Sequence, residues 1–200
     1  MKAIVIATAD GKCLPVLSKS IEMYVPDSVE VIVYKNNAGN YGDAYNHIVS
    51  KAFTQYDEII VANDDIVLNP LSYRHLGEDV SALKTEFGKV GWVVARSDYV
   101  RPAQQAFRMD PNRIGHITQC SPLFGYVHIQ AWVDYPPLNW YSDDIQCIDM
   151  MSKGYQHFVS RSYVHHAGSQ TIGMDNQKNH LDSEAWIKEN RPELHKEWYK

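Results

Sequence analysis

The chain has 200 residues, of which 44% are hydrophobic and 22% charged, and its formal net charge is −5. This length can bury a full core, and the composition excludes a disordered or low-complexity protein. The negative charge argues against a general polyanion-binding surface. Four arginines form a candidate basic patch, but Asp98 and Asp110 dilute it; they are Arg96, Arg101, Arg108 and Arg113.

The first residues and the cysteines suggest a compartment. The apolar run within Met1–Ala7 is too short for a signal sequence and is typical of a core strand. No later run has the length of a membrane span. Cys13, Cys120 and Cys147 are odd in number and widely spaced, which indicates neither a disulfide framework nor a zinc knuckle. We therefore expect a cytoplasmic protein without a membrane span, or one in the host cytoplasm if the chain is viral.

The first third of the chain alternates strands and helices. Ala3–Thr8 and Val29–Tyr34 are expected strands, and Leu14–Tyr24 between them has apolar residues at helical spacing. A helix over Ala44–Phe53 then leads into a strand over Glu58–Ala62. This alternation predicts an α/β fold with a parallel sheet and right-handed crossovers.

The pattern is looser after Pro70. The polar stretch Arg96–Gln119 is long for a plain connection and is typical of a binding or disordered loop. Gly168–His180 is expected to be a mobile loop, and Ser183 is expected to cap a final helix. The remaining expected elements are a helix over Leu76–Phe87, strands over Val90–Ala95, Leu123–Ile129 and Phe158–Val164, and a helix over Asp143–Lys153 that ends at Gly154.

Two adjacent carboxylates end the strand Glu58–Ala62, in the sequence Asn63-Asp64-Asp65. In open α/β sheets ligands bind outside the carboxyl ends of the strands. Oxygen ligands there suit Mg²⁺ or Mn²⁺ holding a phosphorylated compound. Considered alone, the pair has a commoner explanation, which is an Asx-rich turn leaving a strand.

Two further groups follow in the second half of the chain. Asp143 and Asp144 begin an expected helix, where carboxylates complement the helix dipole even without a catalytic role. His165 and His166 follow an expected strand, and a strand end with one packed and one exposed ring would explain them structurally. The order and separation of all these groups favour function.

Together they resemble the GT-A fold glycosyltransferases, particularly the inverting family 2, over about residues 3–171. That resemblance implies a metal at Asp65 and His165, with His166 as the other register, and a catalytic base at Asp144, with Asp143 as the alternate. It places the nucleotide-sugar near Thr8, Ala9, Asp10, Asn36, Asn37, Gly39, Asn46, Asn63 and Asp64. Asn63 replaces the first Asp of the family's Asp-x-Asp motif, so its amide is expected to bind the ribose or sugar.

The resemblance implies a single GT-A-like domain with a Rossmann-like sheet, mostly parallel and mixed on the acceptor side. Residues 1–95 would bind the nucleotide-sugar, residues 96–167 the acceptor, and residues 168–200 would form a mobile loop and a C-terminal helix. The loop would act as a lid, with Lys178 or His180 reaching phosphate, unless it is merely exposed. Trp132, Trp140 and Tyr141 would stack on sugars or lie in the core.

The expected function is transfer of a sugar, with inversion, from a nucleotide-diphosphate-sugar to an acceptor hydroxyl. A UDP-sugar is the expected donor and Mn²⁺ or Mg²⁺ the expected cofactor. The acceptor stays open among a saccharide, a protein and a modified nucleic acid base. Two alternatives remain: a non-catalytic nucleotide-sugar-binding module, and a nucleotidyltransferase, whose Gly-rich, basic triphosphate signature is missing near the first strand.

Overall fold

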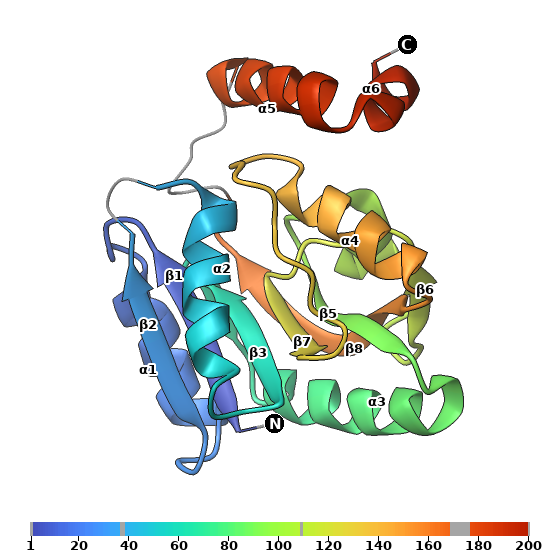
Figure 1. The fold of residues 1–200 in the computed structure, drawn as a ribbon. Helices are drawn as coiled ribbons and strands as arrows, with labels where there is room; N and C mark the ends of the chain where they lie inside the picture. The colour runs from blue at the N-terminus through green and yellow to red at the C-terminus, as the bar shows by residue number, and fades with distance from the viewer. Residues whose placement is uncertain (1, 37–38, 109, 169–176, 200) are drawn as a thin grey trace.

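The computed structural model describes residues 2–36, 39–108, 110–168 and 177–199. Its centre is an eight-stranded sheet with the order β2-β1-β3-β7-β5-β8-β4, and β6 pairs with β8 outside this path (Figure 1). The strands are β1 (Ala3–Thr8), β2 (Glu30–Lys35), β3 (Glu58–Asn63), β4 (Ile66–Leu68), β5 (Val90–Ser97), β6 (Gly115–Ile117), β7 (Phe124–His128) and β8 (Gln156–His166).

The sheet is mixed, as expected, but it is not mostly parallel, since the described strands form three parallel and four antiparallel pairings. β1 pairs in parallel with β2 and β3, and β5 pairs in parallel with β8. The antiparallel pairings involve β7, which lies between β3 and β5, and the short strands β4 and β6, which both pair with β8. The carboxyl ends of β1 and β3 therefore meet at the same edge.

Helices cover both faces of the sheet because the strands bury apolar side chains on both faces. On one face, Leu17 of α1 (Leu14–Tyr24) and Leu76 of α3 (Ser72–Phe87) belong to one buried cluster with Ile4 and Ile60 of the sheet. On the other face, α2 (Tyr41–Ala52) and α4 (Ser142–Ser152) bury a second cluster that includes Trp92. Figure 1 shows α2 and α4 in front of the strands.

A pair of C-terminal helices, α5 (Gln177–Asn190) and α6 (Pro192–Trp198), crosses the end of the molecule beyond α4 (Figure 1). Ile187 and Leu194 of this pair pack on Leu138 and Ile145 in a separate small core. The expected cap at Ser183 is wrong, because α5 begins at Gln177 and Ser183 lies buried inside it. The expected loop Gly168–His180 is therefore helical from Gln177, and residues 169–176 lie outside the described part.

The stretch Arg96–Gln119 contains structure that the sequence did not predict: two short 3₁₀ turns, Pro102–Gln104 and Ala106–Arg108, and strand β6. Arg96 is only 2% exposed, and its guanidinium donates to the backbone carbonyls of Ser160, Asp110 and Arg113. Arg96 therefore does not belong to the candidate basic surface patch. It ties this long connection to β8.

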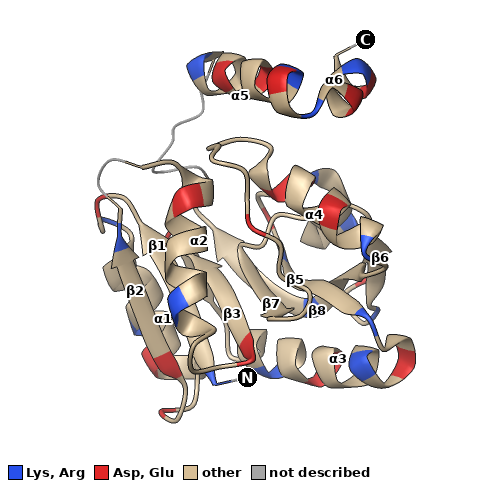
Figure 2. Cartoon of the chain, in the orientation of Figure 1, with Lys and Arg blue, Asp and Glu red and all other residues tan. Residues whose placement is uncertain are grey.

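Within the described ranges, no helix combines the length and the apolar character needed to cross a membrane. Figure 2 shows basic and acidic residues interspersed along α3, α5 and α6. Charges mixed in this way give no extended basic face on these helices.

Candidate active site

A cavity of about 410 Å³ opens beside the carboxyl ends of β1 and β3. Part of its lining comes from the ends of those strands and the residues after them, including Thr8, the last residue of β1, and Asp64. Another part comes from Asn139 to Asp144, which include the first residues of α4. Both acidic groups predicted from the sequence thus line one cavity.

Asp64 lines this cavity and is 6% exposed. The Thr8 hydroxyl donates to its Oδ2 atom, and the backbone N–H of Gly11 donates to the Thr8 oxygen at 2.9 Å. Burial raises the pKa of Asp64, the neighbouring Asp65 charge raises it further, and the Thr8 hydrogen bond opposes them. The end of β1 therefore holds this carboxylate in a fixed orientation.

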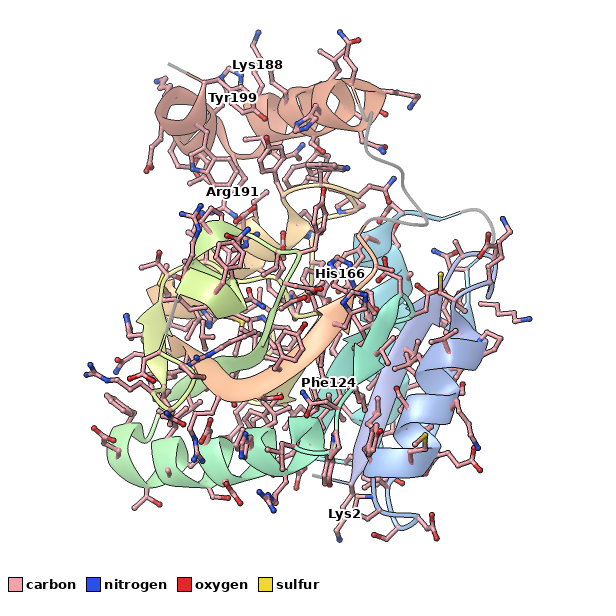
Figure 3. The ribbon with its side chains drawn as sticks, turned by 180° about the vertical axis from the view of Figure 1, so that it is seen from behind. Lys2, Phe124, His166, Lys188, Arg191 and Tyr199 are labelled. Atoms are coloured by element: carbon pink, nitrogen blue, oxygen red, sulfur yellow. The ribbon has the colours of Figure 1, made fainter. Side chains whose placement is uncertain are left out.

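Asp65 faces His166, the last residue of β8, with 3.2 Å between Asp65 Oδ1 and His166 Nε2. Figure 3 shows His166 at the end of β8 nearer the C-terminal helices, with Lys2 at the opposite end of the molecule. Burial alone would lower the pKa of His166, but the hydrogen bond to Asp65 and the Asp65 charge raise it above its ordinary value. Both side chains are less than 10% exposed.

The sequence prediction favoured His165 beside Asp65, and the structure does not place it there. Successive side chains of a strand point to opposite faces, so only one of the two histidines can face Asp65. His165 is 55% exposed and its Nδ1 lies 2.5 Å from Asp98 Oδ2. It does not line the cavity, whereas His166 does.

The ring of His166 is oriented so that it could hold a divalent cation together with Asp65. Its Nδ1 lies 2.5 Å from the carbonyl oxygen of Tyr99, which can only accept, so Nδ1 carries a proton. In the neutral ring, Nε2 then directs a lone pair at Asp65 Oδ1, another acceptor. A proton or a cation must lie between them. Adjacent ligands of a six-coordinate cation, each about 2.1 Å from the metal, lie about 3 Å apart, close to the observed separation.

Within the described residues, no group of three or more His, Cys, Asp or Glu side chains forms a ready metal cage. Mg²⁺ characteristically takes one or two protein carboxylates and completes its shell with water and substrate phosphates. Asp65 and His166, with Asp64 adjacent, fit such an incomplete site. They do not fit a closed structural metal site.

Arg101, another residue that lines the cavity, connects the two carboxylates at the beginning of α4. Its Nη1 donates to Asp144 Oδ1 at 2.6 Å and its Nη2 to Asp143 Oδ2 at 3.0 Å. Its Nε donates to the Ser121 hydroxyl, which in turn donates to Asp143 Oδ2, both at 3.0 Å. The acidic pair raises the pKa of Arg101 although burial opposes this.

The two carboxylates differ in what surrounds them. Asp143 accepts through both oxygens, because its Oδ1 also receives the Asp144 backbone N–H. Burial raises the pKa of Asp143 to about 6, the Asp144 charge adds to this, and Arg101 opposes it. Within the described part of the chain, Asp144 Oδ2 has no hydrogen-bond partner, so Asp144 presents one unoccupied carboxylate oxygen in a cavity-lining position.

The remaining predicted donor-site residues divide into two sets. Ala9, Asn36, Gly39 and Asn63 line the cavity with Thr8 and Asp64. Asp10 does not line it; it pairs with Lys12 near the surface. Asn46 does not line it either, because its amide bonds both backbone groups of Tyr135 at 2.8 Å. Asn37 lies outside the described residues.

Of the other residues singled out in the sequence, Trp140 and Tyr141 line the cavity and Trp132 does not. Lys178 pairs with Asp182 on α5, and His180 contacts Tyr141, so neither is directed at a phosphate in this structure. Arg101 was not predicted as a site residue. It lies more than 40 residues before Asp143, in a polar stretch where no spacing marks it.

No protein-family model matches the sequence, and no curated protein sequence does either. Solved structures do match. TarS from S. aureus in complex with UDP-GlcNAc aligns with 87% of this chain at a TM-score of 0.60 and 13% identity. GalNAc-T7 with UDP, GalNAc and Mn²⁺ aligns with 83% of it at a TM-score of 0.60 and 10% identity. The chain has the GT-A glycosyltransferase fold.

The GT-A likeness extends over most of this chain but only part of its larger neighbours. The alignments span 60% of the TarS structure with UDP-GlcNAc and 43% of the GalNAc-T7 structure. A197 from STIV is nearer in size, with 80% of this chain and 81% of A197 aligned at a TM-score of 0.57 and 13% identity. At such identities the likeness concerns the GT-A fold, and the chemistry must be argued from the residues.

Proposed function

We propose that this chain is a metal-dependent glycosyltransferase that moves a sugar from a nucleotide-diphosphate-sugar to an acceptor hydroxyl. The observation that carries this proposal is one cavity with two different acidic ends. Asp65 with His166 forms an end suited to a cation, and Asp144 with its unoccupied oxygen forms an end suited to a base. A glycosyltransferase needs a cation that stabilises the leaving diphosphate and a base that deprotonates the acceptor, both close to the same bound donor.

The donor would bind at the end formed by β1 and β3. Asn36 and Asn63 offer amide groups, and Ala9 and Gly39 allow close approach of a ligand to the backbone. UDP and UDP-GlcNAc occupy TarS in two of the matched structures, which makes a UDP-sugar the first donor to test. Mn²⁺ accompanies UDP in the GalNAc-T7 structure.

Asp65 and His166 would hold the cation, with Asp64 beside them. When bound, a divalent cation neutralises the charge that develops on the departing diphosphate. The protein's own part is to fix both ligands: Tyr99 sets the His166 tautomer, and burial excludes bulk water from the pair.

Asp144 would act as general base. The acceptor hydroxyl gives its proton to Asp144 Oδ2 while its oxygen forms the new bond to the anomeric carbon and the bond from that carbon to the diphosphate breaks. Asp143 accepts three hydrogen bonds and serves to orient Arg101 and Asp144. With Asp64 and Asp65 given to the cation end, the described cavity residues offer no second free carboxylate as a nucleophile, which supports a single displacement and hence inversion.

The test is UDP release from UDP-GlcNAc, UDP-GalNAc and UDP-glucose with Mn²⁺, first with water alone as acceptor. The wild-type chain should release UDP slowly from at least one donor. Asp144→Asn should lower that rate roughly 10²- to 10⁴-fold while donor affinity stays within about twofold. Asp27→Asn, an exposed residue between α1 and β2, is the matched control and should behave like the wild type.

Each alternative function predicts another result. A non-catalytic binding module would bind the UDP-sugar with Mn²⁺ and release no UDP with any acceptor. A nucleotidyltransferase would release pyrophosphate from a nucleoside triphosphate mixed with a sugar phosphate. UDP release that Asp144→Asn leaves unchanged would reject Asp144 as the base.

A further inference from the structure

The segment Asn139 to Tyr141 forms the part of the cavity wall next to the acidic pair. It is held from both sides. Asn139 Oδ1 accepts the backbone N–H of Tyr41 at 2.9 Å, and the Trp140 carbonyl accepts the Ser183 hydroxyl of α5 at 3.2 Å. The wall is therefore fixed between the donor-side helix α2 and the C-terminal helices.

Tyr141 adopts an unusual backbone conformation in this segment. Its φ of 64° makes it the one non-glycine residue in the left-handed region among the described residues. It immediately precedes Ser142, the first residue of α4, so this turn sets the direction in which α4 presents its carboxylates. The Tyr141 hydroxyl lies 3.2 Å from His180 Nδ1. Strained residues held by their surroundings are frequent at functional sites.

Trp140 offers an aromatic surface and a hydrogen-bond donor at this wall. It is partly buried, and its ring contacts His180 at a centroid distance of 4.4 Å. Its indole N–H has no hydrogen-bond partner in the described part of the chain. By contrast, the indoles of Trp92 and Trp132, which do not line the cavity, donate to Gln146 and Asp134 at 2.8 and 2.9 Å. Trp140 thus retains the capacity to bind a ligand.

The charges around Trp140 restrict the ligand. Four carboxylates line the cavity, and each of the three guanidinium nitrogens of Arg101 already donates to Ser121, Asp143 or Asp144, so its charge is paired with two of those carboxylates. His166 is directed at Asp65. Among the described lining residues, no cation is left unpaired to receive an anionic acceptor. A phosphorylated acceptor or a nucleic acid would face repulsion without compensation.

We infer that Trp140, with Tyr141 beside it, forms the acceptor subsite and that this subsite takes an uncharged saccharide. The apolar face of a sugar ring would pack on the indole, and a sugar hydroxyl would accept the indole N–H. This inference rests on the proposed function, because it gives the acceptor its place next to Asp144. Of the three acceptor classes left open by the sequence, a saccharide, a protein and a modified nucleic acid base, it selects the saccharide.

The first experiment observes binding without catalysis. Saturation-transfer NMR would be recorded with N,N′-diacetylchitobiose, lactose and maltose in the presence of UDP and Mn²⁺. At least one saccharide should receive saturation from the protein and shift the ¹⁵N-labelled indole resonance of Trp140. Trp140→Phe serves to assign that resonance, so this readout does not depend on whether Trp140→Ala folds.

The second experiment is kinetic. With the bound saccharide as acceptor, Trp140→Ala should raise the acceptor KM roughly three- to tenfold, while the donor KM stays within about twofold. Trp140→Phe should keep part of the effect, and Trp132→Phe, outside the cavity, should leave both KM values unchanged. A larger acceptor KM at a constant donor KM is not expected from general destabilisation.

The outcomes separate the two proposals. Saccharide binding at Trp140 without any UDP release would support the subsite and reject the transferase. UDP release with no saccharide contact, or a Trp140 resonance that responds to a serine peptide or an oligonucleotide instead, would overturn the saccharide subsite and leave the transferase standing.

Discussion

Asp65 Oδ1 lies 3.2 Å from His166 Nε2, although the two residues belong to a turn after β3 and to the last position of β8. The short strand β4 brings them together, because Ile66 directly follows Asp65 and pairs with His166 in register. A backbone hydrogen bond from Ala167 to the Asp65 carbonyl at 2.9 Å continues this pairing. The proposed cation site is therefore built into the sheet.

His166→Asn should weaken Mn²⁺ binding at least about tenfold, because a ligand leaves the site and its replacement is shorter. His165→Asn should leave Mn²⁺ affinity unchanged, because that ring faces Asp98 outside the cavity. Titration of free Mn²⁺ by electron paramagnetic resonance measures both. Equal losses in the two variants would contradict the assignment.

Asp98 should act as a positioning residue for His166. Its Oδ1 accepts the His166 backbone N–H at 3.0 Å, and the next residue, Tyr99, supplies the carbonyl that fixes the His166 ring. Asp98→Ala should weaken Mn²⁺ binding roughly tenfold. Asp98→Asn retains a hydrogen-bond acceptor and should keep most of the Mn²⁺ affinity. If Asp98 were purely structural, both variants would lose thermal stability, and their Mn²⁺ affinities would fall by the same factor.

Asp143 should make stability depend on pH. Its pKa is raised to about 6 in the folded protein, from about 4 when unfolded, mainly by burial and by the Asp144 charge. Between these values the folded state binds the extra proton, so this contribution to stability is present at low pH and is lost as pH rises through about 6. Asp143→Asn cannot ionise and should gain stability relative to the wild type by on the order of 1–3 kcal/mol between pH 4 and 7.

Urea unfolding of both proteins at several pH values in this range measures that difference, with Asp27→Asn as the control. Parallel stability curves for wild type and Asp143→Asn would show that Asp143 titrates normally.

Asn46 should matter for folding and not for the donor. Its amide bonds both backbone groups of Tyr135, and the side chain does not line the cavity. Asn46→Ala should cost about 1–3 kcal/mol of unfolding free energy because the partners are left unsatisfied. UDP-GlcNAc affinity should stay within about twofold. Asn63→Ala, which alters a cavity-lining residue, should weaken UDP-GlcNAc binding and leave the unfolding free energy nearly unchanged. Weaker UDP-GlcNAc binding by Asn46→Ala at unchanged stability would contradict this account.

The long apolar and periodic segments were predictable from the sequence. β5 is buried throughout, β1 and β3 are buried over most of their length, and α1 shows its apolar spacing directly, so their positions agree with the prediction within a few residues. The three-residue strands β4 and β6 were missed because so short a segment has no recognisable period. The beginning of α5 was missed because few of its residues are buried.

The sequence predicted many of the residues that line the candidate site, but it did not predict which side chains contact each other. The strand end at Asp65 and the helix start at Asp144 both lie on the cavity, since local patterns mark the ends of elements. The choice between His165 and His166 depends on strand register, which a run of eleven strand residues does not reveal by itself. Arg101 could not be predicted, because only the folded chain brings it to Asp143.

The most direct test of the account is a crystal of the chain soaked with UDP-GlcNAc and Mn²⁺, with anomalous scattering used to locate the manganese. The account predicts a peak about 2.1 Å from a carboxylate oxygen of Asp65 and from His166 Nε2, with the diphosphate completing the shell and the sugar directed toward Asp144. A nucleotide bound in this cavity without manganese at Asp65 and His166, or manganese bound at His165, would contradict it.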